Sequence, residues 1–409
     1  MELNRDAVDL VEATSASGTV EQVVERLLHG RMADSQNSAR LTQAVTDFMD
    51  LLHAEGFLHW SEEPGESNFR IVPATGVKRF FVEMLSGCNL TCAHCYADRG
   101  NSGTRIAEVD RLLKHLDEAI TLGAVKVDVT GGEALLHPSI DRVLSYLAPL
   151  NVKVNLYSNL ATRDDDLLNR LKAYELGSVI TSVDALDPEL HDRIRGRQSS
   201  WDNTVGNIRS LVEEGIPVRA NVVANELNID QIQDLCSFLY EELGVTSIVV
   251  GTLFDTGRQQ EAGIPTVDAH RISLATAAVY KDVFNRSYEV LRRTADHRPP
   301  PLERNTCGVG QDMVFLSSWG EYFLCPVMTD RETGHTRLGS LTSDTFAEVA
   351  ERLENHKRHT QCAEISTCTH GTICRGGCRA RPALKGEGMT ACDSTRRDFF
   401  DQLALLERG

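Results

Sequence analysis

Three cysteines lie close together in the sequence, at Cys88, Cys92 and Cys95, and an aromatic residue, Tyr96, follows the last of them. Thiolates are the usual ligands of iron–sulfur clusters, so this C-x3-C-x2-C spacing can hold three irons of a cubane and leave the fourth bare. A structural zinc site or a disulfide pair is the alternative. A closed zinc site favours two pairs of ligands, whereas these three thiols lie on one short loop. The spacing therefore predicts a cluster whose open iron needs an outside ligand.

The loop also follows an apolar segment, Phe80 to Leu85, and resembles the cluster loop of the radical S-adenosylmethionine (SAM) superfamily. In that superfamily the amino and carboxylate groups of SAM chelate the bare iron, and one electron from the cluster cleaves SAM to a 5'-deoxyadenosyl radical. The resemblance implies that Cys88, Cys92 and Cys95 hold a 4Fe-4S cluster and that Tyr96 contributes to the SAM site.

The helices and strands that would position this loop lie between about Val77 and His297. Short β-branched runs alternate there with helical ones such as Glu108 to Leu122 and Asp166 to Tyr174, which is typical of a parallel α/β fold. The six predicted strands are Arg79–Met84, Val125–Thr130, Lys153–Ser158, Val179–Val183, Val218–Val223 and Ser247–Gly251. Right-handed crossovers would curl six such units into a partial barrel with its active site at the carboxyl ends of the strands. The radical SAM superfamily has such an incomplete (β/α)6 barrel.

Motifs at the predicted strand ends resemble SAM-binding motifs of the superfamily. Gly131, Gly132 and Glu133 follow the second strand in the manner of the GGE motif, whose glycines let the backbone approach the SAM amino group. Glu133 would help to orient this loop. Read alone, the three residues form an ordinary turn, and their position at a strand end is what favours a SAM site.

Other polar residues at strand ends occupy positions that contact the ribose or carboxylate of SAM in the family. They are Ser158, Asn159, Ser182, Asp184, Asn221 and Arg195. A guanidinium suits the SAM carboxylate, although Arg193 or Arg197 could replace Arg195 in that role, and Asn225 could act beside Asn221. Residues of these types are as often turn formers or solvated charges. The loop from Phe254 to Arg258 would lie over the site, with its role left open.

Seven of the eleven cysteines lie from Cys307 onward. The pieces Cys307-x12-Gly320-x4-Cys325 and Cys374-x3-Cys378-x13-Cys392 resemble the SPASM extension, which binds two auxiliary 4Fe-4S clusters in enzymes that modify peptides and proteins. The resemblance implies two ligand sets, which are Cys307, Cys325 and Cys378 for the first cluster and Cys362, Cys368, Cys374 and Cys392 for the second.

The spacing Cys362-x5-Cys368 departs from the family, which usually has a C-x2-C pair at this point. Two all-cysteine cubanes need eight thiolates, so at least one iron must be open or bound by another group. A pair of zinc knuckles is the alternative. The remaining thiol, Cys236, falls at helical spacing with Leu235 and Leu239, which predicts a buried core residue.

The first seventy residues hold 13 acidic and five basic residues, a net charge of −8, and no cysteine. Thr19 to Gln22 predicts a capping box at the start of a helix through Leu28, and a second amphipathic helix should run from Leu41 to Gly56. The segments Phe57–Trp60 and Phe69–Val72 could pair as a hairpin. Helices followed by a hairpin form a winged-helix-like unit, which resembles the peptide-recognition domain related to the pyrroloquinoline quinone peptide chaperone.

In that domain family a leader peptide adds a strand to the sheet edge. A DNA-binding helix-turn-helix has the same outline, but the acidic charge counts against it. The other alternative is a module that merely covers the barrel.

Composition narrows the class of protein further. The chain has 409 residues, 41% of them apolar, and a net charge of −17, which would repel nucleic acid and anionic membranes. No apolar run is long enough to cross a bilayer, and the start of the sequence lacks a basic stretch followed by an apolar one. We therefore expect a cytoplasmic protein whose cysteines are metal ligands rather than disulfides.

Together the resemblances imply a radical SAM/SPASM maturase that modifies a ribosomally made precursor peptide, forming a thioether, a carbon–carbon crosslink or another oxidative change. The expected domains are a peptide-recognition module at 1–72, a partial barrel at 73–297 and an auxiliary-cluster domain at 298–409. Expected cofactors are three 4Fe-4S clusters and SAM, and expected partners are the precursor peptide and an electron donor such as flavodoxin or ferredoxin. The alternative is a radical SAM dehydrogenase, oxidase or epimerase of a small molecule or protein side chain. No catalytic acid, base or radical-quenching residue is assigned.

Overall fold

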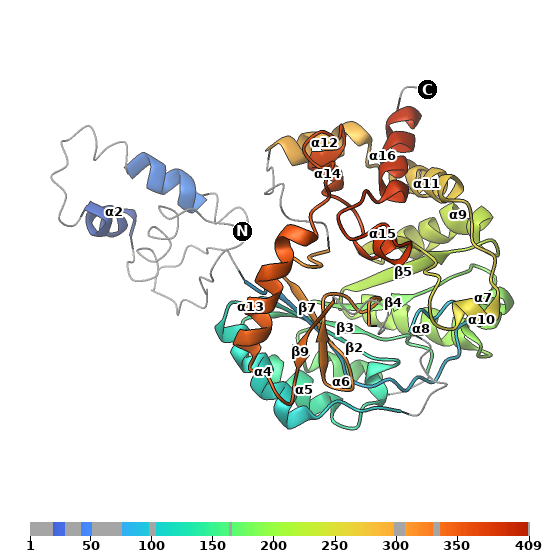
Figure 1. Ribbon diagram of the computed structural model, residues 1–409, viewed down its shortest axis with the longest axis horizontal. Coiled ribbons are helices and arrows are strands. Elements are labelled where there is room, and N and C mark those ends of the chain that lie inside the picture. Colours follow the sequence, from blue (N-terminus) through green and yellow to red (C-terminus); the bar gives the residue numbers. More distant parts are fainter. Residues whose placement is uncertain are drawn as a thin grey trace. The chain divides into compact units, whose positions relative to one another are not determined.

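The computed structural model describes residues 19–28, 42–50, 76–97, 104–162, 166–297, 307–329 and 336–407. The chain divides into two compact units, Met1–Ala74 and Thr75–Gly409 (Figure 1). Each unit has its own hydrophobic core.

The described part of the first unit consists of two helices, α2 (Val20–Leu28) and a helix over residues 42–50. The predicted capping box is confirmed, because the N–H of Gln22 donates to Thr19 Oγ1 (3.3 Å) and the N–H of Thr19 donates to Gln22 Oε1 (3.2 Å). Apolar residues of both helices form a small core, which consists of Val23, Val24, Val45 and Met49. The predicted hairpin segments lie outside the described residues.

The second unit is built on a nine-stranded sheet in the order β6-β5-β4-β3-β2-β1-β7-β8-β9. The first six strands are all parallel and follow one another in chain order. Their bounds are β1 Arg79–Glu83, β2 Lys126–Thr130, β3 Lys153–Tyr157, β4 Ser178–Ser182, β5 Val218–Ala224 and β6 Ser247–Thr252. The predicted parallel α/β fold is thus confirmed, with each strand within one residue of its expected bounds.

Helices connect these strands, as parallel pairing requires. The segments after β1 to β3 are α4 Val109–Thr121, η1 Ala134–Leu136, α5 Ile140–Leu147 and α6 Leu167–Lys172. Those after β4 and β5 are α7 Pro188–Arg195, α8 Ser200–Glu213, η2 Ile229–Gln231, α9 Ile232–Ser237 and the π-helical η3 Phe238–Glu242. After β6 come α10 Gln259–Ala262, α11 Ala269–Ala278, the π-helical η4 Val279–Val283 and α12 Tyr288–His297.

The C-terminal region extends the same sheet. Strand β7 (Met313–Leu316) pairs parallel to β1, and β8 (Glu321–Phe323) and β9 (Arg337–Ser340) continue antiparallel. The remaining helices are α13 Phe346–His356, η6 Lys357–His359, α14 Gly371–Cys374, α15 Ala380–Leu384 and α16 Ser394–Leu406. Helix α13 packs beside α4, and α16 packs on α11 (Figure 1).

Aromatic packing joins this region to the first strand of the sheet. The rings of Phe80 and Phe346 stack at 5.5 Å, and Tyr322 meets Phe80 edge-on at 6.0 Å. The hydroxyl of Tyr322 also lies 2.8 Å from Nδ1 of the buried His115 on α4. Such aromatic contacts bury a large apolar area, so β1, β8, α4 and α13 share one core.

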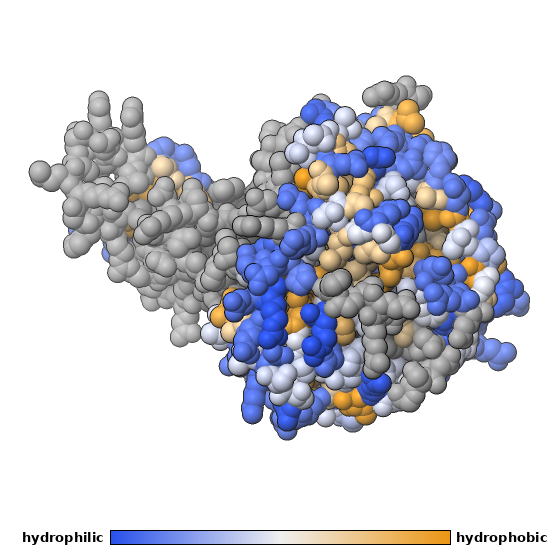
Figure 2. Space-filling view, viewed as in Figure 1, coloured by the Kyte–Doolittle hydropathy of each residue, from blue (hydrophilic) through white to orange (hydrophobic). Residues whose placement is uncertain are grey.

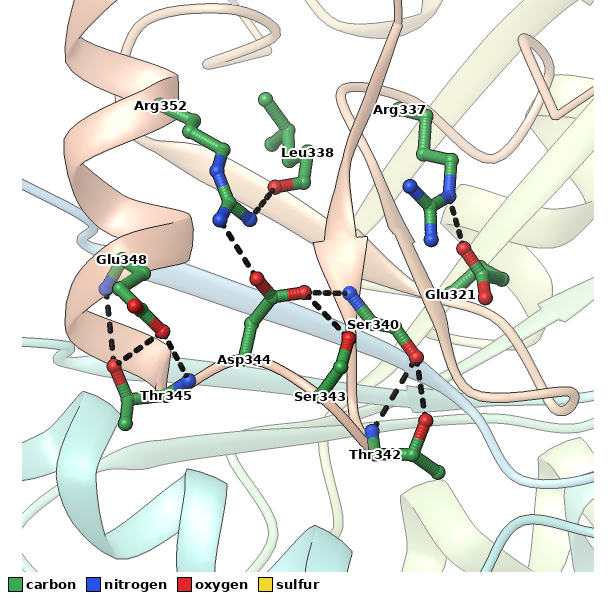
Figure 3. Close-up of polar contacts among 10 residues, drawn as sticks. All are labelled: Glu321, Arg337, Leu338, Ser340, Thr342, Ser343, Asp344, Thr345, Glu348 and Arg352. Atoms are coloured by element: carbon green, nitrogen blue, oxygen red, sulfur yellow. Dashed lines mark hydrogen bonds and ion pairs between the residues drawn. The ribbon is translucent and has the colours of Figure 1, made fainter.

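A polar network fixes the turn between β9 and α13 (Figure 3). Asp344 accepts from the N–H of Ser340 (2.7 Å) and pairs with Arg352 (2.7 Å), which also donates to the Leu338 carbonyl (2.8 Å). Thr345 and Glu348 form a capping box at the start of α13. These contacts set the angle at which α13 leaves the sheet.

On the face shown in Figure 2, hydrophilic side chains cover most of the described surface, and apolar residues lie in smaller areas between them. None of the described helices combines the length and the apolar character that crossing a membrane would require.

Candidate active site and iron–sulfur ligands

The cluster loop, residues 84–97, follows β1 and packs against the segment after β2. The N–H of Gly132 donates to the Leu85 carbonyl (2.7 Å). A Cβ atom on Gly132 would lie 2.3 Å from the Gly87 carbonyl oxygen, and one on Gly131 would lie 3.0 Å from the Leu85 carbonyl oxygen. At Gly132 in particular, the surrounding backbone leaves no room for a side chain. The predicted glycine pair therefore supports the backbone of the cluster loop directly.

The three thiols of the loop lie within electrostatic reach of one another. Burial raises the pKa of Cys88 to about 11, and the neighbouring Cys92 and Cys95 add to that rise. Burial also raises the pKa of Cys92, while the Arg195 guanidinium, whose Nη1 lies 3.8 Å from Cys92 Sγ, opposes the rise. Asn159 Nδ2 lies 3.8 Å from Cys88 Sγ. The three predicted ligands thus lie near one another, with the Arg195 guanidinium beside Cys92 and the Asn159 amide beside Cys88.

Glu133 connects the ends of β2 and β3. Its Oε1 accepts from the N–H of Leu135 (3.0 Å), and its Oε2 accepts from the N–H of Asn159 (2.7 Å). Burial raises the pKa of this carboxyl, although these hydrogen bonds and one from Ser158 act in the opposite direction. Ser158 Oγ also accepts from the N–H of Leu160 (3.1 Å), so both predicted β3 residues belong to this turn.

Asp184 and Arg195 form a buried ion pair beneath the cluster loop. Nη2 of Arg195 lies 2.9 Å from Asp184 Oδ2, and Nε2 of His94 lies 3.6 Å from the same oxygen. Asp184 Oδ1 accepts from the N–H of Val223 (3.0 Å). Burial alone would raise the pKa of Asp184, but Arg195 and His94 outweigh it, and the pKa is lowered. The carboxylate is therefore held ionised, and it orients a guanidinium that also faces Cys92.

The remaining predicted residues lie as follows. Ser182 and Asn221 are half-buried register partners on β4 and β5. Asn225 is buried and holds a turn, with its amide donating to the Val223 carbonyl (2.9 Å). Arg193 is exposed, whereas Arg197 donates to a carbonyl of the cluster loop (3.3 Å). Of the three arginines, Arg195 alone is both buried and close to a loop thiol.

The loop after β6 contacts and supports the cluster loop, a role that the sequence does not indicate. The N–H of Arg258 donates to the Cys95 carbonyl (3.0 Å), and its Nη1 donates to the Cys92 carbonyl (2.8 Å). A Cβ on Gly257, whose φ is +63°, would lie 2.4 Å from the Tyr96 carbonyl oxygen. Tyr96 itself is 38% exposed. The sequence signal for this contact is a glycine within the loop that follows β6.

The C-terminal cysteines gather into two groups. The proximal cysteine group consists of Cys307, Cys325 and Cys378. Burial raises the pKa of Cys325, and the other two thiols raise it further. The distal cysteine group consists of Cys362, Cys368, Cys374 and Cys392. Burial raises the pKa of Cys392, to which Cys362 and Cys368 add, and burial raises that of Cys374 to about 11, to which Cys368 adds.

All eleven cysteines are free of disulfides. Cys236 is fully buried in the core, as predicted, and burial raises its pKa to about 12. The part of the chain that the structure describes contains no group of three or more His, Cys, Asp or Glu arranged to hold a metal ion. A cubane differs from a single-ion site because each thiolate binds a separate iron.

Residues 82–239 match the Radical SAM superfamily. The chain contains a radical SAM superfamily domain. This domain includes the cluster loop, the glycine pair, Asp184 and Arg195, and the superfamily uses a 4Fe-4S cluster and SAM. Three half-buried thiols that lie near one another fit that cluster, because bound iron supplies the positive charge that thiolates shielded from solvent need.

Two curated relatives are similar to this chain over most of its length. AlbA, the antilisterial bacteriocin subtilosin biosynthesis protein of Bacillus subtilis (strain 168), is 26% identical over 309 residues, which cover 72% of this chain and 66% of AlbA. The match therefore spans slightly less than two thirds of AlbA. The AdoMet-dependent heme synthase of Methanosarcina barkeri (strain Fusaro / DSM 804) is 24% identical, covering 73% of this chain and 90% of that protein.

The fold is similar to that of Streptococcus suis SuiB, solved in complex with S-adenosylmethionine. The TM-score is 0.65 at 16% identity, covering 97% of this chain and 93% of SuiB. SuiB has also been solved bound to the precursor peptide SuiA, and that structure gives a TM-score of 0.63 at 15% identity, with 87% and 89% of the two chains covered.

Proposed function

We propose that this chain is a radical SAM/SPASM peptide maturase. The observation that carries the proposal is the grouping of ten free cysteines into three sets whose thiols lie near one another, all within the unit built on the nine-stranded sheet. A radical SAM domain alone needs only the first group. Two further groups are consistent with auxiliary clusters that exchange electrons with a substrate.

The loop cysteines Cys88, Cys92 and Cys95 would hold the SAM-binding cluster. When bound, this cluster and SAM supply a 5'-deoxyadenosyl radical that takes a hydrogen from the substrate. Arg195 supports the site with a positive charge next to Cys92, and Asp184 fixes the orientation of that guanidinium. Further SAM contacts are proposed for residues around the loop and at the strand ends: Tyr96, Gly131, Gly132, Glu133, Ser158, Asn159, Ser182, Asp184, Arg195 and Asn221.

The proximal cysteine group would hold a cluster by three thiolates and leave one iron for another ligand, whereas the distal cysteine group offers four thiolates. The burial of Cys325, Cys362 and Cys374 supports metal ligation, since buried free thiols have little other use at such density. We place this SPASM region at 298–409 and the barrel at 73–297. β7 pairs with β1, and Arg79 of β1 donates to the Cys307 carbonyl (3.4 Å), so this part of the proximal group is attached to the sheet that carries the cluster loop.

A precursor peptide is the proposed substrate, with its leader bound by a module at 1–72. Support comes from AlbA, whose name places it in bacteriocin biosynthesis, and from SuiB, which has been solved with a precursor peptide. Flavodoxin or ferredoxin would donate the electrons. Eleven free cysteines favour a reducing compartment, which supports a cytoplasmic location.

A second candidate is a radical SAM enzyme that oxidises a small molecule. The heme synthase relative favours it, because the match covers 90% of that protein's length. The presence of the acidic N-terminal module favours the peptide reaction, since a small substrate needs no leader-binding unit.

The proposal is tested with reconstituted protein, SAM and a reductant. Three cubanes correspond to about twelve irons, and replacing all three loop cysteines by alanine should remove about four of them. Cys92→Ala should abolish 5'-deoxyadenosine formation, while the control Cys236→Ala should retain it, because Cys236 belongs to the core. Stoichiometric zinc with little iron, or SAM cleavage in Cys92→Ala, would contradict the proposal.

The peptide substrate is tested by mass spectrometry of a candidate precursor from the same gene neighbourhood after co-expression. Cys378→Ala should still form 5'-deoxyadenosine but should leave the precursor unmodified, because the proximal group lies outside the cluster loop. A modified small molecule with an unchanged peptide would instead favour the second candidate.

A further inference from the structure

Arg379 is a charged side chain with no solvent exposure. It directly follows Cys378 of the proximal cysteine group and precedes α15. Only Nη1 of its guanidinium is hydrogen-bonded, and it donates to the carbonyls of Met389 and Ala391, both at 2.9 Å. Carbonyl oxygens are neutral, so these bonds fix the position of the group without balancing its charge.

The other guanidinium nitrogens of Arg379, Nε and Nη2, have no hydrogen-bond partner among the described residues. Its neighbour Arg381, by contrast, pairs with Asp393 at 2.9 Å. A guanidinium stays protonated in proteins, and burying it without an anion is costly. The surroundings of Arg379 should therefore supply a negative charge that the polypeptide's carboxylates do not provide.

Cysteines of both C-terminal groups lie near this guanidinium. The pKa of Cys307 is raised by burial, and Arg379 is among the groups that act against that rise. A Cβ on Gly376, whose φ is +85°, would lie 2.9 Å from Cys362 Cβ and 3.3 Å from Arg379 Nη2. Arg379 thus lies close to the proximal group through Cys378 and Cys307 and to the distal group through Cys362.

We propose that the buried guanidinium of Arg379 balances the negative charge of the clusters held by the proximal and distal cysteine groups. It thereby raises their reduction potentials and acts as a positioning residue for electron transfer. This inference rests on the proposed function. One-electron reduction adds one negative charge to a cluster, and a fixed cation beside the cluster stabilises the reduced form. Free N–H donors near cluster sulfur act in the same direction.

The test uses the full chain with Cys88, Cys92 and Cys95 replaced by alanine, so that only auxiliary clusters contribute to the signal. After reconstitution, the clusters are titrated with reductant and followed by electron paramagnetic resonance. Arg379→Gln removes the charge, and Arg379→Lys keeps it. The control is Arg397→Gln, which removes a 46% exposed guanidinium that is paired with Glu364 and acts on Cys392 of the distal group.

We expect Arg379→Gln to shift the ratio of reduced to oxidised cluster at least tenfold toward the oxidised form, a fall of about 59 mV or more. Arg379→Lys should retain most of the parent potential, and Arg397→Gln should leave it nearly unchanged because solvent screens that charge. Unchanged potentials in Arg379→Gln, equal falls in both Arg379 variants, or loss of auxiliary iron from both would overturn the assignment. Absence of iron from the parent chain would instead refute the proposed function.

Discussion

Gly132 shows that a residue type can be required at the site by its contact with the protein backbone rather than by its contact with the ligand. The sequence suggested that the glycine pair lets the backbone approach SAM. In the structure, the space beside Gly132 is occupied by the Gly87 carbonyl of the cluster loop. The same residue type is thus required even before any cofactor is bound, because a Cβ would push the loop away.

Gly132→Ala should therefore lose most of its loop-bound iron and its SAM cleavage, since the new Cβ would lie 2.3 Å from the Gly87 oxygen. The matched control is Gly206→Ala on α8, where a Cβ meets nothing within 4 Å. That change should be neutral or should stabilise the helix by up to about 1 kcal/mol. Iron content and 5'-deoxyadenosine yield distinguish the variants, and full activity in Gly132→Ala would show that the loop tolerates displacement.

His191 should make the stability of the same region depend on pH. Its Nδ1 accepts from the N–H of Asp184 (3.2 Å), which only a neutral ring with a free Nδ1 can do. Burial lowers the pKa of His191 to about 4, with the positive charge of Arg195 contributing. The unfolded chain binds this proton near pH 6.5, so folded-state stability should fall as the pH drops from about 6.5 toward 4.

Between pH 7.5 and 5.5, His191 should account for about 1 kcal/mol of lost stability. His191→Asn keeps an acceptor without a titrating group, and its loss of thermal midpoint over this pH range should be smaller by a corresponding amount. Intrinsic fluorescence melts at both pH values measure this difference. The exposed His270, replaced as His270→Asn, provides a control for the loss of one histidine. Parallel slopes in all three proteins would show that His191 is already protonated or solvated when folded.

At the scale of elements, the C-terminal strands depend on the start of α13. Thr345 Oγ1 accepts from the N–H of Glu348 (3.3 Å; Figure 3). The adjacent Phe346 packs in the core against Phe80. A weakened cap would loosen the contact between α13 and the sheet that carries the cluster loop.

Thr345→Ala should cost about 1 kcal/mol of unfolding free energy, because one helix N–H loses its acceptor. Thr345→Ser keeps the hydroxyl and should restore most of that loss. Urea denaturation followed by circular dichroism measures both variants. A stability equal to that of the parent in Thr345→Ala would mean that packing of Phe346 alone fixes the helix start.

Local patterns allowed the parallel strands and the capping box at Thr19 to be predicted, because each depends on residues close in sequence. Contacts between distant segments could not be predicted. The carbonyl of Ile194, at the end of α7, accepts from the N–H of Ala93 in the cluster loop (2.9 Å). Likewise, β7 is only four residues long, and its buried run gives no sign that it pairs with β1.

The predicted site residues divide in the same way, into those that follow from local patterns and those that depend on contacts between distant segments. Spacing predicted the cysteine groups, since a cluster loop is local, and thiols within each group lie close enough to affect one another's pKa. Their ligation of iron stays a prediction. The partners of Arg195 could not be read from sequence, because Asp184 and Cys92 come from separate elements. Asn225 illustrates the opposite case, in which a polar residue at a strand end holds a turn.

For the whole molecule, the continuous sheet means that the cluster loop and the C-terminal cysteine groups share one framework. The main core draws its residues from Val77 onward, whereas the first unit has a separate core of Val23, Val24, Val45 and Met49. The fold of the second unit should therefore survive removal of the first. Under the proposed function, the second unit would carry out the radical chemistry and the first would capture the substrate.

A chain beginning at Thr75 should keep its iron and its basal SAM cleavage but lose affinity for a full precursor peptide. Backbone pairing with a leader would supply most of the attraction, and the −8 charge of the first seventy residues would favour a basic leader. Binding to the full chain should therefore weaken as salt rises. Fluorescence anisotropy with a labelled precursor compares both chains, and a leaderless peptide provides the matched control. Equal affinities would reduce the first unit to a cover for the barrel and favour a small-molecule substrate.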